Sequence, residues 1–235
     1  WQGLAMGVGQ KLLVPSPLSV VERLGGIWQE ADFWGTVWFT FRKIVAGFLL
    51  GLGFGLGLGA LAGRFPLFEI LFRPWATMIK SIPVASFIII CLIWMSSSRL
   101  SIFISFLMVL PVVWSNVSGG IRAVDRNLLE MAQVFRLRRR DKLQKIYLPA
   151  VMPYFMAACT AGAGMAWKAG IAAEVLGSTR LSIGGKIYES KIYLETVDLF
   201  AWTAVLIVLS ILFERGFVAL VGWLGRRMER RVRAS

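Results

Sequence analysis

Histidine is absent from this chain of 235 residues, and cysteine occurs only twice, at Cys91 and Cys159. Without histidine there is no imidazole to act as a general base, and there is no cluster of histidines and cysteines to hold a metal ion. Both cysteines lie in apolar stretches, so no disulfide framework is expected. A nucleotide-binding P-loop is missing too, because the run from Gly184 to Ile187 lacks the upstream glycine and has no Ser or Thr after Lys186. These absences exclude histidine-dependent catalysis, a zinc cluster and ATP binding through a P-loop.

Acidic residues are few. The chain has 13 Asp and Glu against 26 Lys and Arg, which gives a formal net charge of +13 and a sequence pI of about 10.6. At the same time 57% of the residues are hydrophobic and the mean hydropathy is +0.69. This combination indicates a polytopic membrane protein. The positive charges are segregated by loop, so they point to membrane topology and not to nucleic-acid binding.

Five apolar stretches are long enough to cross a bilayer as helices, and they predict an all-α protein. They cover residues 36–63, 70–95, 102–120, 154–176 and 199–224. The second contains Pro74 and Pro83, which we interpret as kinks, although such breaks also occur beside transport pathways.

A glycine stripe marks the first of these spans. Its members recur every four residues, so they share one helix face. They are Gly47, Gly51, Gly55, Gly59 and Gly63. Small residues let two helix backbones approach closely in lipid, so the stripe predicts tight helix packing, with ligand contact as the alternative.

The long polar segment 121–153 separates the third and fourth spans. Apolar residues recur in it at helical spacing and predict two short amphipathic helices joined near residues 136–140. Asp125 or Asn127 is expected to cap the first helix. Pro149 and Pro153 are expected to mark where the chain turns back into the membrane.

The run Glu130, Met131 and Ala132, followed by Leu148 and Pro149, resembles the EAA loop of permease subunits in binding-protein-dependent ABC importers. In that family the loop is a coupling helix that docks into a cleft of a separate ATPase subunit. The family usually has glycine where this chain has Arg136. Since glycine adopts the left-handed conformation without steric cost, the loop either bends differently here or has its turn elsewhere.

Two other interpretations of the segment stay open. Asn127 and Glu130 have the spacing of a capping box, so Glu130 has a possible local partner at its own helix start. A basic interfacial loop of a membrane protein also needs no partner protein.

The resemblance extends over nearly the whole chain and is closest to the nitrate, sulfonate, taurine and bicarbonate group. It rests on Pro15-Ser16-Pro17, the glycine helix, the proline-broken span, the coupling segment and the run from Gly164 to Gly177. It implies a type I importer permease fold in a single transmembrane domain, residues 1–235. The coupling segment is then 121–149, and an extracytoplasmic loop with a short helix covers 177–198. The family's first transmembrane helix is expected to lie mostly before Trp1.

The resemblance also implies the partners. A second permease copy is expected to form a homodimer in the lipid bilayer of a bacterial inner membrane. A cytoplasmic ATPase binds ATP and Mg, so this chain needs no cofactor and is not itself an enzyme, and a soluble extracytoplasmic protein delivers a small solute. Nitrate, a sulfonate, taurine or bicarbonate would fit the group, whereas nucleic acid is not an expected partner.

Candidate site residues follow from the resemblance. Leu129, Met131 and Phe135 are the expected apolar anchors in the ATPase cleft, and Glu130 with Arg136–Arg140 is expected to make charged contacts at its rim. Ala132 and Pro149 complete the coupling set.

Asn116, Lys168 and Glu174 are candidates for the translocation pathway, because polar groups inside spans usually face a bundle interior or an aqueous cavity. In a homodimer, two copies of Lys168 would attract an anion. Alternatively, Lys168 pairs with Glu174 or Glu214 of a neighbouring helix or extends to the membrane interface. Lys168 and Glu174 are six residues apart, so they lie on different faces of one helix and are not expected to pair with each other.

The distribution of positive charge predicts the orientation. If the coupling segment is cytoplasmic, the loops on its side carry sixteen Lys and Arg, among them Arg73 and Lys80, against five on the other side. This asymmetry is what the positive-inside rule expects, and it places the C-terminus in the cytoplasm as well.

Two other classes of function remain at this stage. A stand-alone carrier or channel would need its own ion-coupling site near the middle of the membrane, whereas Glu174 and Glu214 lie nearer the ends of their spans. A membrane-embedded lipid enzyme is the weakest alternative, since the chain shows no nucleophile motif and no pair of carboxylates within a span.

Overall fold

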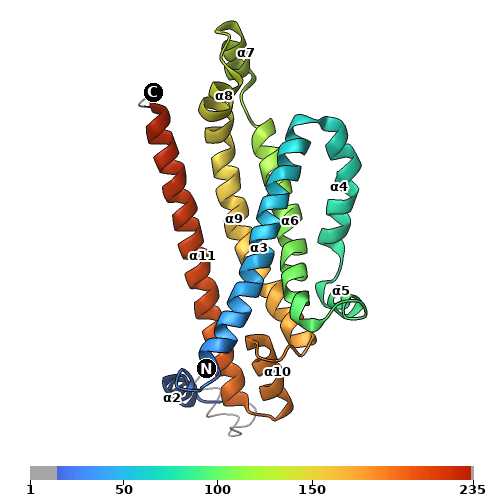
Figure 1. Ribbon diagram of the computed structural model, residues 1–235, viewed down its shortest axis with the longest axis vertical. Helices are drawn as coiled ribbons and strands as arrows, with labels where there is room; N and C mark the ends of the chain where they lie inside the picture. The colour runs from blue at the N-terminus through green and yellow to red at the C-terminus, as the bar shows by residue number, and fades with distance from the viewer. Residues whose placement is uncertain (1–14, 234–235) are drawn as a thin grey trace. The chain divides into compact units, whose positions relative to one another are not determined.

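The computed structural model describes residues 15–233, with side chains as far as Arg227, and this part of the chain consists of helices joined by short connections (Figure 1). The helices are α2 (Pro17–Ile27), α3 (Phe33–Arg64), α4 (Pro66–Ser81), α5 (Val84–Cys91), α6 (Ser97–Arg122), α7 (Arg126–Val134), α8 (Arg139–Lys142), α9 (Leu148–Leu176), α10 (Ile183–Ile192) and α11 (Thr196–Arg233). A π-helical turn, η1 (Leu143–Tyr147), lies between α8 and α9. The all-α prediction is confirmed. The predicted first transmembrane helix concerns residues before Pro15, which lie outside the described range.

The chain forms two compact units. Unit 1 comprises Trp1–Gly47, Pro83–Ser105 and Ala166–Leu212, and unit 2 comprises Phe48–Ile82, Phe106–Met165 and Phe213–Ser235. The helices α3, α6, α9 and α11 each contribute residues to both units. The single transmembrane domain over residues 1–235 stays a prediction.

Within the described residues, four helical stretches are long and apolar enough to cross a membrane: Phe33–Arg64, Ser97–Arg122, Arg139–Leu176 and Thr196–Arg227. The pair α4 and α5 passes the same test together, but it is bent by 97° at the break between its helices. If this pair is counted as one broken span, the part of the chain that the structure describes has up to five spans, in the order that the hydropathy predicts.

The bend between α4 and α5 corrects the expectation of one kinked span. Ile82 precedes Pro83 and has an extended backbone, φ −71° and ψ 128°, because the proline ring clashes with a helical residue before it. The chain therefore leaves α4 and starts a new helix after Pro83. Pro74, by contrast, lies inside α4 without ending it. Only one of the two prolines breaks the span.

The second short helix of the coupling segment is also corrected. Four residues of α8 lead through η1 directly into α9, so that Arg139–Leu176 is one helix of 38 residues. Pro149 lies in the first turn of α9 and the chain does not turn there. Proline has no N–H to donate and its ring crowds the carbonyl four residues earlier, so the preceding turn widens to the π form.

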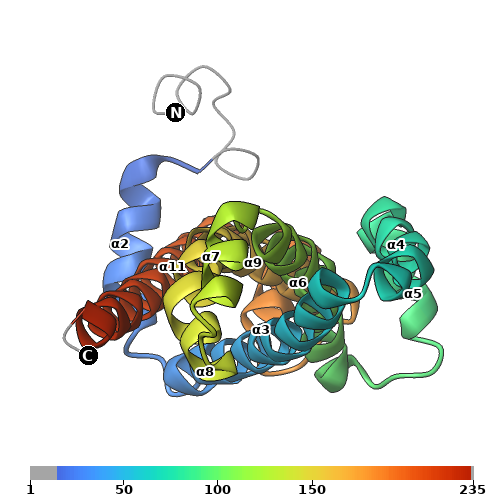
Figure 2. The same cartoon turned by 90° about the horizontal axis from the view of Figure 1, so that it is seen from above.

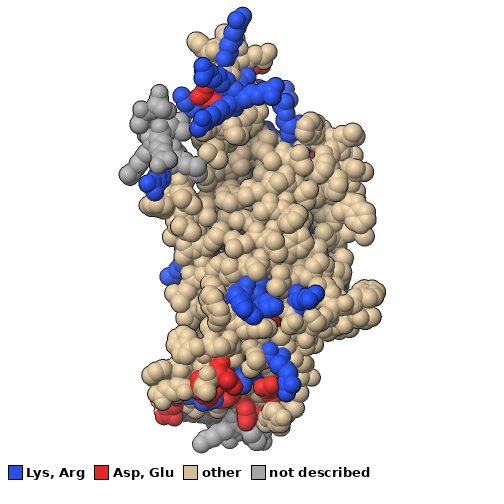
Figure 3. All heavy atoms as spheres, viewed as in Figure 1, with Lys and Arg blue, Asp and Glu red and all other residues tan. Residues whose placement is uncertain are grey.

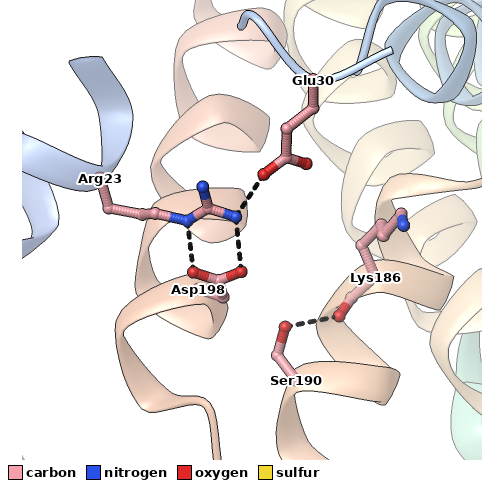
Figure 4. Close-up of polar contacts among 5 residues, drawn as sticks. All are labelled: Arg23, Glu30, Lys186, Ser190 and Asp198. Carbon is pink, nitrogen blue, oxygen red and sulfur yellow. Dashed lines mark hydrogen bonds and ion pairs between the residues drawn. The ribbon is translucent and has the colours of Figure 1, made fainter. Parts of the chain in front are cut away.

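In unit 1, α2 begins as its sequence predicts. The Ser16 side chain accepts from the backbone N–H of Ser19 and Pro17 occupies the first turn. Arg23 of α2 then donates two hydrogen bonds to the Asp198 carboxylate, at 2.5 and 2.8 Å, and one to Glu30 (Figure 4). The bond to Asp198 is the main cause that raises the pKa of Arg23, so this residue stays charged at any physiological pH. The ion pairs tie α2 to the start of α11.

The glycine stripe of α3 lies against α6 (Figure 1, Figure 2). In unit 1, a Cβ added to Gly47 would lie 2.4 Å from the carbonyl oxygen of Ile102. In unit 2, a Cβ added to Gly51, Gly55, Gly59 or Gly63 would lie 2.7–2.8 Å from the Cβ of Val109, Val113, Val117 or Ile121, respectively. The partners also recur every four residues. Real Cβ atoms do not come this close, so the stripe sets the spacing of the two helices.

Candidate functional site

The helix α7 of unit 2 carries the predicted coupling residues. Asp125 is its N-cap, and the carboxylate accepts from the backbone N–H of Asn127 at 2.9 Å. This settles which of the two candidate residues caps the helix. Asn127 is the second residue of α7, so it does not form a capping box with Glu130.

One face of α7 packs onto unit 2. Ala132 is fully buried and forms a small core with Val124 and Ile146. Residues partly buried against this core are Leu129, Leu137, Tyr147 and Ala150. Leu129, an expected anchor for the ATPase, therefore faces inward and supports the helix from behind.

The other face of α7 is apolar and exposed. It comprises Leu128 (44% exposed), Met131 (46%), Val134 (79%) and Phe135 (73%), and we call these four residues the outer face of α7. Met131 and Phe135 were expected there, whereas Leu128 and Val134 were not named. A soluble surface rarely keeps such a cluster uncovered, so the outer face has the character of a contact surface.

Arg136 ends α7 in the left-handed conformation, with φ +50°. Its N–H bonds to the Gln133 carbonyl at 3.0 Å, and the Leu137 N–H bonds to the Ala132 carbonyl at 3.0 Å. These are the two hydrogen bonds of a Schellman motif, and Leu137 makes the apolar contact that usually accompanies it. The turn has therefore not moved. Arginine adopts the conformation for which the family uses glycine.

Positive charge surrounds this helix end. Arg136, Arg138, Arg139 and Arg140 are exposed, as is Glu130 on α7, and Lys and Arg gather over α7 and α8 (Figure 3). Pro149 is exposed at the start of α9. The coupling segment thus presents an apolar outer face bordered by arginines.

The three pathway candidates lie in different settings. The Asn116 amide donates to the Val112 carbonyl of its own helix at 2.8 Å and is half-buried. Lys168 is exposed on α9, and no carboxylate among the described residues of unit 1 lies within 4 Å of its ammonium group. Glu174, by contrast, is completely buried.

Glu174 joins three helices of unit 1. Its Oε2 accepts from the Thr40 hydroxyl of α3 at 2.9 Å and from the Gly184 N–H of α10 at 3.2 Å. Thr40 in turn accepts from the Ile183 N–H at 2.9 Å. A carboxylate at a helix N-terminus satisfies backbone groups that have no partner within the helix. The buried Glu174 therefore holds the start of α10 against α3 and α9.

Sequence reasoning did not find this arrangement. The available signal was the pair Gly184–Gly185, since a Cβ on Gly184 would lie 2.3 Å from the Cβ of Glu174 and one on Gly185 would lie 2.1 Å from the Thr179 carbonyl oxygen. The glycines allow close approach of α10 to the end of α9. No group of three or more acidic or cysteine side chains within the described range is arranged to hold a metal ion.

The fold agrees with the comparisons to known proteins. Residues 51–233 match the profile of the family described as binding-protein-dependent transport system inner membrane component. This range covers nearly all of unit 2 and more than half of unit 1.

Similar proteins have names that agree with the family. The putative aliphatic sulfonates transport permease protein of Bacillus subtilis is 27% identical over 94% of this chain and 80% of its own length. The taurine transport system permease protein of Escherichia coli is 23% identical over 94% of this chain and 82% of its own length. The bicarbonate transport system permease protein of Synechococcus elongatus is 24% identical over 87% and 73%, respectively. The chain therefore belongs to the family of binding-protein-dependent transport system inner membrane components, as a multi-pass permease subunit that is not itself an ATPase.

Proposed function

We propose that this permease subunit forms the translocation pathway of an importer for a small anion. The relatives named for sulfonates, taurine and bicarbonate support an anionic or zwitterionic solute with an acidic group. Membership of a family of transport components that depend on a binding protein does not favour a stand-alone carrier or channel.

The geometry of α7 is the observation that carries the proposal. The helix is held from behind by the core of Val124, Ala132 and Ile146, and it presents its apolar outer face to the surroundings. An amphipathic helix with one exposed apolar face fits a groove on a partner. We infer that the partner is a cytoplasmic ATPase, which binds ATP and Mg, and that Arg138, Arg139 and Arg140 meet acidic groups at the rim of its groove.

Topology and the other partners follow from the same proposal. The coupling segment and the C-terminus lie in the cytoplasm of a bacterial cell with this chain in its inner membrane. A soluble binding protein delivers the anion on the other side, at the segment that carries α10. A second, identical permease copy completes the pathway. Positive charge over α7 and α8 supports this orientation through the positive-inside rule.

Transport then has a simple physical form. ATP favours the closed ATPase pair, and the loaded binding protein favours the outward-open permease. ATP and the loaded binding protein each shift the population of conformations only because each binds one conformation more tightly than the other. The helix α7 links the two equilibria, since it contacts the ATPase with its outer face and unit 2 with its inner face.

Purification of the tagged full-length chain from native membranes in mild detergent tests the proposal. We expect mass spectrometry to identify a soluble P-loop ATPase in equal amount. If the chain emerges alone under conditions that keep a known importer intact, the coupling role of α7 is refuted.

A single substitution tests the outer face itself. Phe135→Asp places a charge where an apolar anchor is expected, and loss of one buried aromatic contact should weaken ATPase association by about thirtyfold or more. Ile192→Asp is the control, because Ile192 is 57% exposed on α10 of unit 1 and has no expected ATPase contact. The ATPase recovered with each variant is quantified, and equal recovery with both would remove Phe135 from the interface.

A further inference from the structure

The helix α4 of unit 2 has a polar face. Arg73, Thr77 and Lys80 are all exposed. At 100° per residue, their directions fall within a sector of about 60° on the helix. Thr77 donates to the carbonyl of Arg73 in its own helix at 3.0 Å, so its hydroxyl does not reach a neighbouring helix.

The other sides of α4 are apolar. Phe72 packs edge-on against Trp114 of α6, with ring centroids 6.3 Å apart, and this side faces the unit. Large apolar side chains occupy another side and are 57–78% exposed, as expected for contact with lipid; they are Leu67, Leu71, Trp75 and Met78. The polar face therefore lies between the packed side and the lipid-facing side.

The polar face lies beside a helix that is long and apolar enough to cross a membrane. Glu69 of α4 forms an ion pair with Arg122 at the end of α6, and the Lys80 ammonium donates to the Ser115 hydroxyl of α6 at 3.3 Å. The helix α4 thus runs alongside the last part of a membrane span. Ionisable side chains at such depth face a water-filled cavity or other protein, since exposure to lipid is costly.

Two further observations indicate water and uncompensated positive charge. Ile70, Arg73, Pro74 and Thr77 line a depression of about 480 Å³. Pro74 has no N–H to give the carbonyl of Ile70, so that carbonyl needs another donor at this site. Within the described part of the chain, no carboxylate lies within 4 Å of Arg73 or Lys80.

We propose that the polar face of α4, formed by Arg73, Thr77 and Lys80 with Ser115 of α6 beside it, lines the aqueous pathway and attracts a small oxyanion. The proposal rests on the proposed importer function and names the residues that give its pathway an anion preference. Two cations that no carboxylate neutralises raise the local concentration of anions and lower that of cations.

Charged thiol reagents test the proposal without knowledge of the substrate. The full-length protein, with whatever subunits accompany it, is placed in nanodiscs after Cys91 and Cys159, both buried, are replaced by serine. Thr77→Cys is then treated with 2-sulfonatoethyl methanethiosulfonate, an anion, or with its trimethylammonium analogue, a cation. Each rate is divided by the rate of the same reagent with a small free thiol. Leu71→Cys, on the lipid-facing side of α4, is the control.

We expect Thr77→Cys to react with both reagents and to prefer the anion, whereas Leu71→Cys reacts slowly with either. Adding Lys80→Gln or Arg73→Gln should lower the ratio of anionic to cationic rates by about threefold or more, since one charge about 7 Å away acts oppositely on the two reagents. Two results would overturn the proposal. In the first, Thr77→Cys reacts as slowly as Leu71→Cys. In the second, the ratio of anionic to cationic rates does not change when Lys80 or Arg73 is replaced.

The result separates this proposal from the importer function. If no ATPase accompanies the wild-type chain but the ratio behaves as expected, the importer function fails and the anion-attracting path stands. If an ATPase is present and the ratio does not respond, only the path is removed.

Discussion

Replacing Arg136 by glycine should stabilise the C-terminal end of α7. An L-residue in the left-handed conformation is destabilised by about 1.5 kcal/mol, and glycine avoids this cost. Glycine also gives the unfolded segment more freedom, which opposes the gain by about 0.7 kcal/mol. The net gain of about 0.8 kcal/mol corresponds to about a fourfold lower population of the locally opened state.

Hydrogen exchange reports this opening directly. The Leu137 N–H is bonded to the Ala132 carbonyl and becomes free to exchange when the Schellman motif opens. Mass spectrometry of peptides covering residues 126–147 should therefore show about fourfold slower exchange in Arg136→Gly. Arg136→Val should exchange faster than wild type, because a β-branched residue tolerates this conformation poorly.

Arg138→Gly is the matched control for the change in charge. Arg138 has φ −62° and ψ 151°, an ordinary extended conformation in which glycine relieves no strain. We expect faster or unchanged exchange in this variant, since only the flexibility of glycine acts. Equal slowing in Arg136→Gly and Arg138→Gly would show that charge, and not backbone conformation, sets the stability of this turn, and it would refute the reasoning.

Two further predictions concern helix packing. Gly55→Ala should lower the temperature at which the detergent-solubilised protein loses its monodisperse size-exclusion peak, because the new Cβ would lie 2.7 Å from the Cβ of Val113. Gly53→Ala is the control, because its Cβ would meet nothing within 4 Å, and it should not lower this temperature. Equal effects of the two variants would contradict the packing role of Gly55. Glu174→Ala should destabilise unit 1 by about 2–4 kcal/mol, because it leaves the Thr40 hydroxyl and a backbone N–H of α10 buried without their acceptor. Glu174→Gln keeps an acceptor oxygen, so it should lower the temperature at which the monodisperse peak is lost much less than Glu174→Ala does. Equal decreases for the two variants would show that these hydrogen bonds do not stabilise unit 1.

The spans were predictable because their signal is local. Apolar length alone locates α3, α6, α9 and α11. Four-residue spacing likewise identified the face of α3 that approaches α6. None of these inferences needs knowledge of distant residues. The break between α4 and α5 was not predicted, because both prolines of that span were interpreted as kinks.

The inward and outward faces of α7 could not be assigned from the sequence. Periodicity shows that Leu129 and Met131 differ in direction, but not which of them faces unit 2. That choice is fixed by Val124 and Ile146, which reach Ala132 from other segments. Leu129 was therefore expected on the surface that contacts the ATPase, whereas it supports the helix from the opposite side.

Long-range polar contacts were out of reach for the same reason. Thr40, Glu174 and Gly184 are far apart along the chain, and only the fold brings them together. Arg73 and Lys80 were counted among the cytoplasmic positive charges, although the predicted span 70–95 contains both. In the structure α4 extends from Pro66 to Ser81 and includes both.

The unbroken helix from Arg139 to Leu176 has a mechanical consequence. At 1.5 Å per residue it is a rod of about 57 Å. A tilt of about 5° at one end of such a rod displaces its other end by about 5 Å, the rise of roughly one helical turn. The helix follows α7 along the chain, and its last turn carries Glu174. Leverage along a single backbone can thus carry motion from one end of the helix to the other, with η1 as the place where the rod bends most easily, and no relay of side-chain contacts is needed.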